Sequence, residues 1–541
     1  MAASTTTDGI TMAERFRQFN TTSTTVADFG QRSYMASCAF NYGYDVGNFG
    51  AVQGMQAFGK RFGQCDADTG VCALPAWLSS LMTSLPFFGK AIGAIACGSI
   101  AERWGRKAAV MVLAILSFIG VLLQTSATTA AQFTIGRFIS FGMTGMTLIV
   151  VPIYQGETSP RAIRGTVTST LQLMIIGGQV VASLVTLGTK GISSNASWQI
   201  PVGLQFVAPS VIVAFWPFVP ESPRWLLSRN RVEDAKKELQ RLHKGESESR
   251  IDFEIEALRH AQSIERKGSW GELFNKANRV RTMVAVIAMF GQQITGQAFA
   301  SQYSVIFFQG EGFKSQSFLF NVLTNVAAFV CLIGEWLIID KVGRRTMLMV
   351  GGSGMAIFMF VIGGVGVVAD PTQPQKKALV CIYIVFPNSC WIANRKYQVA
   401  SFILYTCAYN LSWAACSYVV VSEAASTHIK EKTNLFAGVI SILTTFLTSF
   451  TVPYLLKAPY ANLGAKVGFI YGSLCTVMVV VAYLFIPELK GRSLEEVDQL
   501  FASGRPLREY KNVQTRPIDE PEHVLEDSGK NGDVSTSVYI K

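Results

Sequence analysis

The sequence predicts an all-α membrane protein with twelve transmembrane helices in two six-helix halves. Half of the 541 residues are hydrophobic and only 15% are charged, which is too apolar a composition for a soluble protein. The apolar residues come in long runs, and about 20 mostly apolar residues are enough to cross a bilayer as a helix. Three short motifs also occur twice, in the same order, once in each half of the chain.

The same composition argues against an enzyme, a metal protein and a nucleic-acid-binding protein. The four histidines, His243, His260, His428 and His523, fall in polar connecting segments, and no metal-ligand cluster, phosphate-binding loop or nucleophile elbow is visible. We therefore expect no cofactor. The net charge of +11 does not indicate nucleic acid, because the basic residues collect between the apolar runs, as the positive-inside rule expects.

The apolar runs and the polar segments between them divide the chain into five parts. The parts are a polar tail (1–32), a first half (33–220), a charged linker (221–281), a second half (282–488) and a polar tail (489–541). The spans expected in the first half are 33–54, 77–100, 108–126, 131–153, 166–188 and 200–219. Those expected in the second half are 282–308, 318–339, 346–368, 400–422, 433–456 and 467–487.

The linker is dense in charge but carries helical apolar spacing at Ala235, Leu239 and Leu242. We therefore expect short surface helices in it. The tail after Glu488 is polar, and we expect it to be disordered beyond Glu509.

Basic residues predict the sidedness. They gather in alternate connections, namely those with Arg103 and Arg106, with Arg164, with the linker, with Arg344 and Arg345, and with Lys430 and Lys432. This set should be cytoplasmic, which places both termini inside. Two segments with basic residues do not fit this pattern, because they lie on the predicted outside. They are Lys60-Arg61 and the region 371–399.

The outer loops carry two candidate modifications. Cys65 and Cys72 share the first external loop, where an oxidising compartment permits a disulfide; two free cysteines are the alternative, and the sequence leaves both open. Asn195-Ala196-Ser197 is a glycosylation sequon on the predicted outer side.

The two halves repeat. Gly105-Arg106-Lys107 follows span two, and Gly343-Arg344-Arg345 follows span eight. Glu157 and Glu423 each stand seven residues before a basic residue, and Pro220-Glu221 and Pro487-Glu488 close spans six and twelve. Transporters built from two parallel six-helix repeats have this duplication, with a site between the halves near the midplane.

The second half carries about 28 more residues than the first between its motifs. The candidate insertion is 371–399. It is either a genuine extracellular elaboration or translated non-coding sequence, and the residues slightly favour the second interpretation, since 378–380 can run directly into 400.

Taken together, the motifs resemble the sugar porter family of the major facilitator superfamily, in its fungal branch. The resemblance covers about residues 34–500. The matching stretches are 43–47, 102–107, 136–137, 152–157, 164–165, 220–226, 292–296, 340–345 and 487–491. It implies a major facilitator fold and a plasma-membrane sugar carrier.

The resemblance also implies a cytoplasmic gating network. Its members here are Arg103, Arg106, Glu157, Arg164, Asp340, Arg344, Arg345, Glu423 and Lys430. Opposed guanidinium and carboxylate groups can pair bidentately, and in the family such pairs hold the outward-facing state. Incidental ion pairs at cytoplasmic helix ends are the alternative.

Asp45 and Arg137 are the residues we expect to couple transport to a proton. Both lie inside spans, where an acid is expensive unless it is paired or functional. In proton-coupled relatives the matching pair is thought to take up and release a proton; a static salt bridge is the alternative. Lys90 in span two can neutralise Asp45 instead. Glu335 lies near the cytoplasmic end of span eight, and we expect it to reach water.

Sugar recognition needs groups that both donate and accept hydrogen bonds, set among aromatic faces. The candidates are Gln172, Gln292, Gln293 and Trp413, followed by Asn410 and Tyr418. Polar residues within spans can also hold helices together. Ala298 stands where hexose carriers have an asparagine, which puts plain glucose in doubt.

We therefore expect a monomeric carrier that imports a sugar with a proton by alternating access. Two alternatives remain. A passive uniporter would share nearly every feature, and a non-transporting sugar sensor would use the same fold to signal.

Overall fold

The computed structural model describes residues 26–65, 72–158, 164–242, 248–264, 268–276, 278–367, 391–490, 492, 494–503 and 505–512. The two terminal tails and the greater part of the 371–399 stretch lie outside these residues. So do the side chains of Arg164 and Asp340, which belong to the expected gating network.

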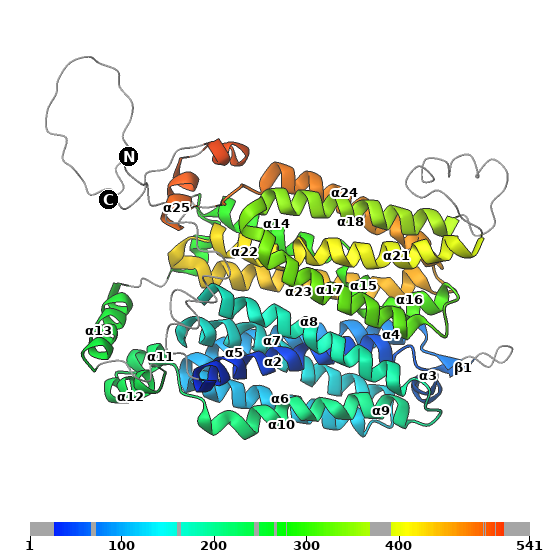
Figure 1. The fold of residues 1–541 in the computed structure, drawn as a ribbon, viewed down its shortest axis with the longest axis horizontal. Coiled ribbons are helices and arrows are strands. Elements are labelled where there is room, and N and C mark those ends of the chain that lie inside the picture. Colours follow the sequence, from blue (N-terminus) through cyan, green and yellow to red (C-terminus); the bar gives the residue numbers. More distant parts are fainter. Residues whose placement is uncertain are drawn as a thin grey trace, which may run out of the picture.

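Long, nearly parallel helices form two layers, the first half in one and the second half in the other (Figure 1). The first half contains α2 (Val26–Val52), α3 (Gln56–Phe62), α4 (Ala76–Ser84), α5 (Pro86–Trp104), α6 (Arg106–Thr125), α7 (Ala130–Thr158), α8 (Arg164–Thr189), α9 (Ala196–Gly203), η1 (Leu204–Phe206), α10 (Val207–Phe215) and η2 (Trp216–Phe218). A two-stranded antiparallel hairpin of β1 (Gln64–Cys65) and β2 (Cys72–Ala73) follows α3.

The second half contains α14 (Arg279–Ile294), α15 (Gln297–Gln302), α16 (Ser304–Gly310), α17 (Ser317–Val342), α18 (Arg344–Val367), α21 (Trp391–Asn410), α22 (Trp413–Ala424), η4 (Thr427–Ile429), α23 (Lys430–Leu456), η5 (Gly464–Lys466) and α24 (Val467–Phe485). Because α21 begins at Trp391, the last residues of the 371–399 stretch are the first turns of span ten. The expected start of that span at residue 400 is therefore too late.

Within the described residues, eleven segments are long and apolar enough to cross a membrane. The twelfth expected span is α2, which has 27 residues but is made more polar by buried Asn41, Asp45 and Asn48. It runs the length of the first-half layer (Figure 1). The all-α fold predicted from the sequence is confirmed.

Small residues bring α2 and α8 into close contact. A Cβ added at Gly43 would lie 1.8 Å from the carbonyl oxygen of Ile175, and one at Gly178 would lie 2.3 Å from that of Phe40. Helices in a bilayer associate by close packing rather than by a hydrophobic drive, and small residues permit it. This contact fixes the position of Asp45, one turn beyond Tyr42 on the same helix.

The linker forms α11 (Pro223–Ser228), α12 (Val232–Leu242), α13 (Glu248–Ile264) and η3 (Trp270–Phe274). The side chains of Ala235, Leu239 and Leu242 are buried, as their spacing predicts. The tail contains two further elements that we did not expect, α25 (Leu494–Ala502) and η6 (Leu507–Asn512). Helices α11, α12, α13 and α25 lie at one end of the molecule, and α3 and the hairpin lie at the other (Figure 1).

Candidate functional site

A buried carboxylate and a buried guanidinium meet inside the first half. Arg137 Nη1 of α7 lies 3.6 Å from Asp45 Oδ1 of α2, and both side chains are at most 3% exposed. Ser140, one turn along α7, donates a 2.7 Å hydrogen bond to Asp45 Oδ2. Asp45 Oδ1 accepts no hydrogen bond. The ion pair is therefore loose, and one carboxylate oxygen is left to take a proton.

Arg137 is held by groups other than Asp45. Its Nε donates to the Met82 carbonyl at 3.1 Å, and its guanidinium lies 3.8 Å from the ring centroid of Phe49 and 4.9 Å from that of Phe141. Cation–π contacts of this kind are favourable in a desolvated site. The arginine can thus keep its position when Asp45 is neutral.

Lys90 does not pair with Asp45. Its Nζ donates to the Tyr42 hydroxyl at 2.9 Å and lies 4.9 Å from the centroid of the same ring. The alternative in which Lys90 neutralises Asp45 directly is wrong for this conformation, because the lysine reaches the phenol one turn before the aspartate.

Glu335 does not reach water, contrary to our expectation. Its side chain is fully buried in α17, where Oε1 accepts a 3.1 Å hydrogen bond from the Cys416 backbone in the first turn of α22. Helix N-termini favour negative charge, which explains why the acid points inward.

The candidate sugar-binding residues divide into two groups. Gln172 and Gln293 are half-buried, and Tyr418 is 42% exposed. Gln292, Trp413 and Asn410 are buried and bonded inside the second half: the Gln292 amide donates to the Ala414 carbonyl at 2.7 Å, the Trp413 indole to Leu348 at 3.0 Å, and the Asn410 amide to Thr406 at 2.8 Å. In this conformation the first group is the more accessible to a ligand, although the Gln293 amide also donates to Gln292 Oε1 at 3.0 Å.

Tyr42 belongs with the first group, although sequence reasoning did not select it. It is half-buried in α2 and is close enough to Tyr418 of the other half to interact with it electrostatically. Its position one turn before Asp45 was the signal that could have identified it.

Two arginine–glutamate pairs lie at the end that carries the linker. Arg106 donates to both oxygens of Glu157, at 2.9 and 2.6 Å. Arg344 donates twice to Glu423 Oε1, at 3.2 and 2.9 Å. Each pair joins helices of one half, so each fastens its own half rather than bridging the two.

The other described members of the expected network lie apart from these pairs. Arg103 is exposed and rests 5.7 Å from the Trp104 ring, and Arg345 donates to the Tyr483 carbonyl at 2.6 Å. Lys430 interacts electrostatically with Glu423.

Glu221 and Glu488 have a role that sequence reasoning missed. Glu221 accepts hydrogen bonds from the backbone of Arg106 and Lys107, at 3.0 and 3.1 Å, and Glu488 accepts from Arg344 and Arg345 at 2.9 and 3.1 Å. Each carboxylate therefore caps the helix that follows the repeated glycine motif. Burial raises the pKa of Glu221, while backbone hydrogen bonds from Ser222, Lys107 and Arg106 oppose the shift.

The two halves are joined by hydrogen bonds at the opposite end. Gln53 donates to the Gln302 carbonyl at 2.6 Å, Gln309 to Gly54 at 2.9 Å, Ser80 to Phe450 at 2.6 Å and Lys457 to Leu74 at 2.7 Å. We call this set the external barrier. Its residues lie near α3 and the hairpin, at the end the positive-inside rule places outside.

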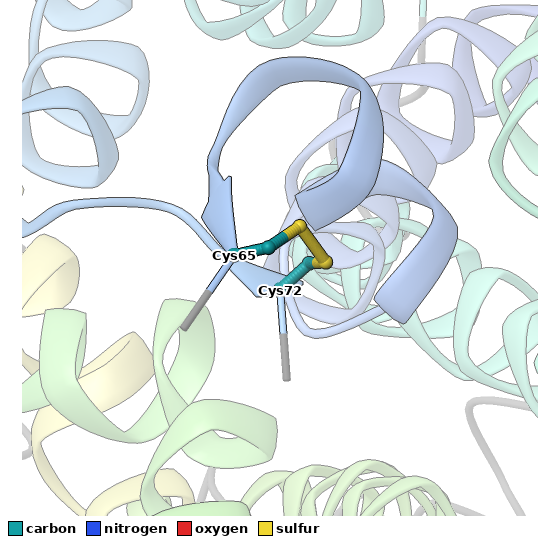
Figure 2. Close-up of a disulfide and its surroundings, with 2 residues drawn as sticks. All are labelled: Cys65 and Cys72. Carbon is teal, nitrogen blue, oxygen red and sulfur yellow. A yellow bond between two sulfur atoms is a disulfide. The ribbon is translucent and has the colours of Figure 1, made fainter. Parts of the chain in front are cut away.

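The external barrier adjoins the β1–β2 hairpin, whose strands are linked by a disulfide. Cys65 and Cys72 form a disulfide with an S–S distance of 1.96 Å (Figure 2), and Leu74 of the barrier follows it by two residues. Asn195 is exposed and begins α9 at the same end.

Comparison with known proteins agrees with this architecture. The family model described as "Sugar (and other) transporter" matches residues 33–501. The chain belongs to this sugar transporter family. Among curated members, the low-affinity glucose transporter HXT1 of Saccharomyces cerevisiae is 31% identical over 497 residues, covering 89% of this chain and 82% of that protein. The high-affinity glucose transporter ght2 of Schizosaccharomyces pombe is 27% identical, covering 94% of each chain.

Solved structures of the xylose transporter XylE share the fold. The inward-open xylose transporter XylE of E. coli matches with a TM-score of 0.69 at 21% identity, covering 87% of this chain and 99% of that chain. The predicted major facilitator fold is confirmed, and the protein is a multi-pass membrane transporter rather than an enzyme.

Proposed function

We propose that this sugar transporter imports its sugar together with a proton, by alternating access across the plasma membrane. The observation that carries the proposal is the Asp45 site. A carboxylate that is 1% exposed, paired loosely at 3.6 Å and held on one oxygen only can change its protonation state without the loss of a strong bond. A permanent structural salt bridge normally has closer, bidentate geometry.

Helix α2 connects this site to the external barrier. Asp45 lies on α2, which ends at Val52, and the next two residues, Gln53 and Gly54, bond to the second half. Arg137 is bound to Met82 of α4, and α4 also carries Ser80 of the barrier. A change in the charge of Asp45 therefore acts on two helices that close the external face, which is a bistable element of the kind that alternating access needs.

The sugar is bound between the halves by groups from both. We assign Gln172 and Tyr42 from the first half and Gln293 and Tyr418 from the second. Their amide and hydroxyl groups match a polyhydroxyl ligand, and the aromatic faces match its apolar side. Gln292 positions Gln293, since it accepts a 3.0 Å hydrogen bond from it. Trp413 and Asn410 shape the second half in this conformation.

We assign the two arginine–glutamate pairs to the cytoplasmic gate, where each holds together the helices of its own half. Both pairs are formed here, while the external barrier is closed. The two pairs alone therefore do not distinguish the inward-facing state from the outward-facing state. The conformational change between these states must also involve other groups at the basic end.

Proteoliposomes test the proposal. The expected result is that an imposed inward proton gradient drives labelled sugar above its external concentration. Asp45→Asn should abolish this accumulation but retain exchange of labelled for unlabelled sugar. Undiminished accumulation by the variant would remove the coupling role.

The two alternatives have distinct outcomes in the same assay. A uniporter equilibrates sugar and ignores the proton gradient in the wild type. A sensor shows neither uptake nor exchange with any sugar, although the protein is correctly inserted.

A further inference from the structure

A cleft opens at the basic end of the second half, away from the sugar site. It has a volume of about 740 Å³, within the range of about 300–1,000 Å³ that is typical of small-molecule sites. Its lining comes from the start of α14, the end of α24, α25 and the segment that includes η6: Lys276, Val280, Met283, Leu484, Phe485, Phe501, Arg505, Pro506, Leu507, Arg508, Glu509 and Tyr510.

The tail segment beside this cleft is bonded to the transmembrane helices. Arg281 of α14 forms an ion pair with Asp498 of α25, and its guanidinium lies 4.6 Å from the Phe501 ring. Phe501 and Tyr510 pack edge to face with centroids 5.4 Å apart. The tail segment is thus fastened to the transmembrane bundle, and the cleft is a built feature of the fold.

One wall of the cleft is basic. It is formed by Lys276, Arg505 and Arg508. The Arg508 guanidinium lies 5.2 Å from the ring of Tyr483. None of the three side chains forms an ion pair or hydrogen bond with the described residues. Glu509 is the one acid of the lining, so the wall keeps an excess of positive charge.

The other wall is apolar and faces outward. Met283 is 37% exposed and Phe485 is 38% exposed, and both lie at the ends of membrane-spanning helices. Acyl chains surround such positions in a bilayer. A ligand of this cleft must therefore have an anionic head beside the basic wall and a hydrocarbon part along the apolar one.

We propose that this cleft binds the headgroup of an anionic phospholipid of the cytoplasmic leaflet, with the acyl chains lying along Met283 and Phe485. Basic pockets beside transmembrane helices on the cytoplasmic side recognise anionic lipid in this way. The site is independent of sugar binding and of Asp45. It fastens α14, which carries Gln292 and Gln293, to the inner membrane surface.

Native mass spectrometry of the full chain in a neutral detergent tests the proposal. The protein is titrated with phosphatidylserine and with phosphatidylcholine of the same acyl length, and wild type should retain the first preferentially. Arg505→Gln with Arg508→Gln should weaken phosphatidylserine binding roughly 25-fold, or about fivefold for each charge removed. Lys276→Gln alone, which leaves every described contact of the tail intact, should cost about fivefold.

The matched control removes the same charge from the same end of the molecule. Lys237→Gln with Arg259→Gln alters two exposed residues of the linker helices and should leave lipid binding within about twofold. Equal loss in this control, or no loss in the cleft variants, overturns the proposal.

Two further arms identify the source of the anion. Inorganic phosphate in excess should not displace the lipid, and displacement would assign the cleft to a soluble anion. Removal of 513–541 should leave the lipid affinity unchanged. If lipid binds only after this truncation, the acidic tail is the occupant of the cleft in the intact chain. That outcome would overturn the proposal.

Discussion

Ser140 donates a 2.7 Å hydrogen bond to the Asp45 carboxylate, whereas the nearest Arg137 nitrogen lies 3.6 Å away. The closest partner of the buried acid is thus a hydroxyl rather than the guanidinium. Gln124 donates to the same hydroxyl at 3.2 Å, which orients the hydroxyl proton toward Asp45. The neutral residues of this chain therefore help to set how readily the acid takes up a proton.

We predict that Ser140→Ala shifts proton-driven uptake toward alkaline pH. The variant removes a donor that favours the charged carboxylate, and a hydrogen bond to a charged group contributes about 1.5–3 kcal/mol. The pH at which accumulation is half-maximal should rise by about one to two units. Ser183→Ala, which removes a hydroxyl bonded only within its own helix, is the control and should leave the profile in place.

Lys90→Gln should leave proton-coupled accumulation intact, because Lys90 bonds to Tyr42 rather than to Asp45. Its effect should appear as a higher KM for sugar, since Tyr42 loses the donor that orients its hydroxyl. Sugar uptake measured across a concentration series, with and without a proton gradient, separates the two effects. Loss of coupling with an unchanged KM would return Lys90 to the proton site.

Glu221→Gln and Glu488→Gln should each lower stability, because an amide offers one acceptor oxygen to three backbone donors. Loss of a helix cap costs about 1 kcal/mol, which corresponds to a fall of about 2 °C in Tm for a domain of this size. Thermal unfolding of the purified protein in detergent measures this fall in Tm. Glu256→Gln, an exposed change on α13, is the matched control, and equal shifts in all three variants would contradict the capping role.

The external barrier should close more firmly as pH rises from about 8 toward 10.5. Burial lowers the pKa of Lys457 from 10.5 to about 8, whereas an open face returns the amine to water and to its ordinary pKa. The closed face therefore binds fewer protons within this interval and gains stability as pH increases. Below pH 8 the lysine is protonated in both states, and this dependence disappears.

Spin-label distances across the external face measure this closure. Labels at Arg61→Cys and Lys314→Cys, both exposed, report the separation of the halves at that end. Lys457→Met should remove the pH dependence between 8 and 10.5. A dependence that persists in the variant would assign it to another group.

The sequence by itself determined the membrane-spanning character of the helices, the duplicated motifs and the two ionisable residues of the proposed coupling site. Long apolar runs report their transmembrane character without reference to neighbours, and a charge inside such a run stands out because the bilayer makes it expensive. The helical apolar spacing of the linker likewise predicted α12.

Only the tertiary structure decided which polar groups are free. Gln292 and Gln293 are adjacent in sequence, yet one bonds to Ala414 and the other remains half-buried. Lys90 bonds to Tyr42 rather than to Asp45. Glu221 and Glu488 cap helices that begin more than 100 residues earlier in the chain. Hydropathy records how each residue partitions on its own, whereas these partnerships depend on which helices pack together, and that is set by the fold as a whole.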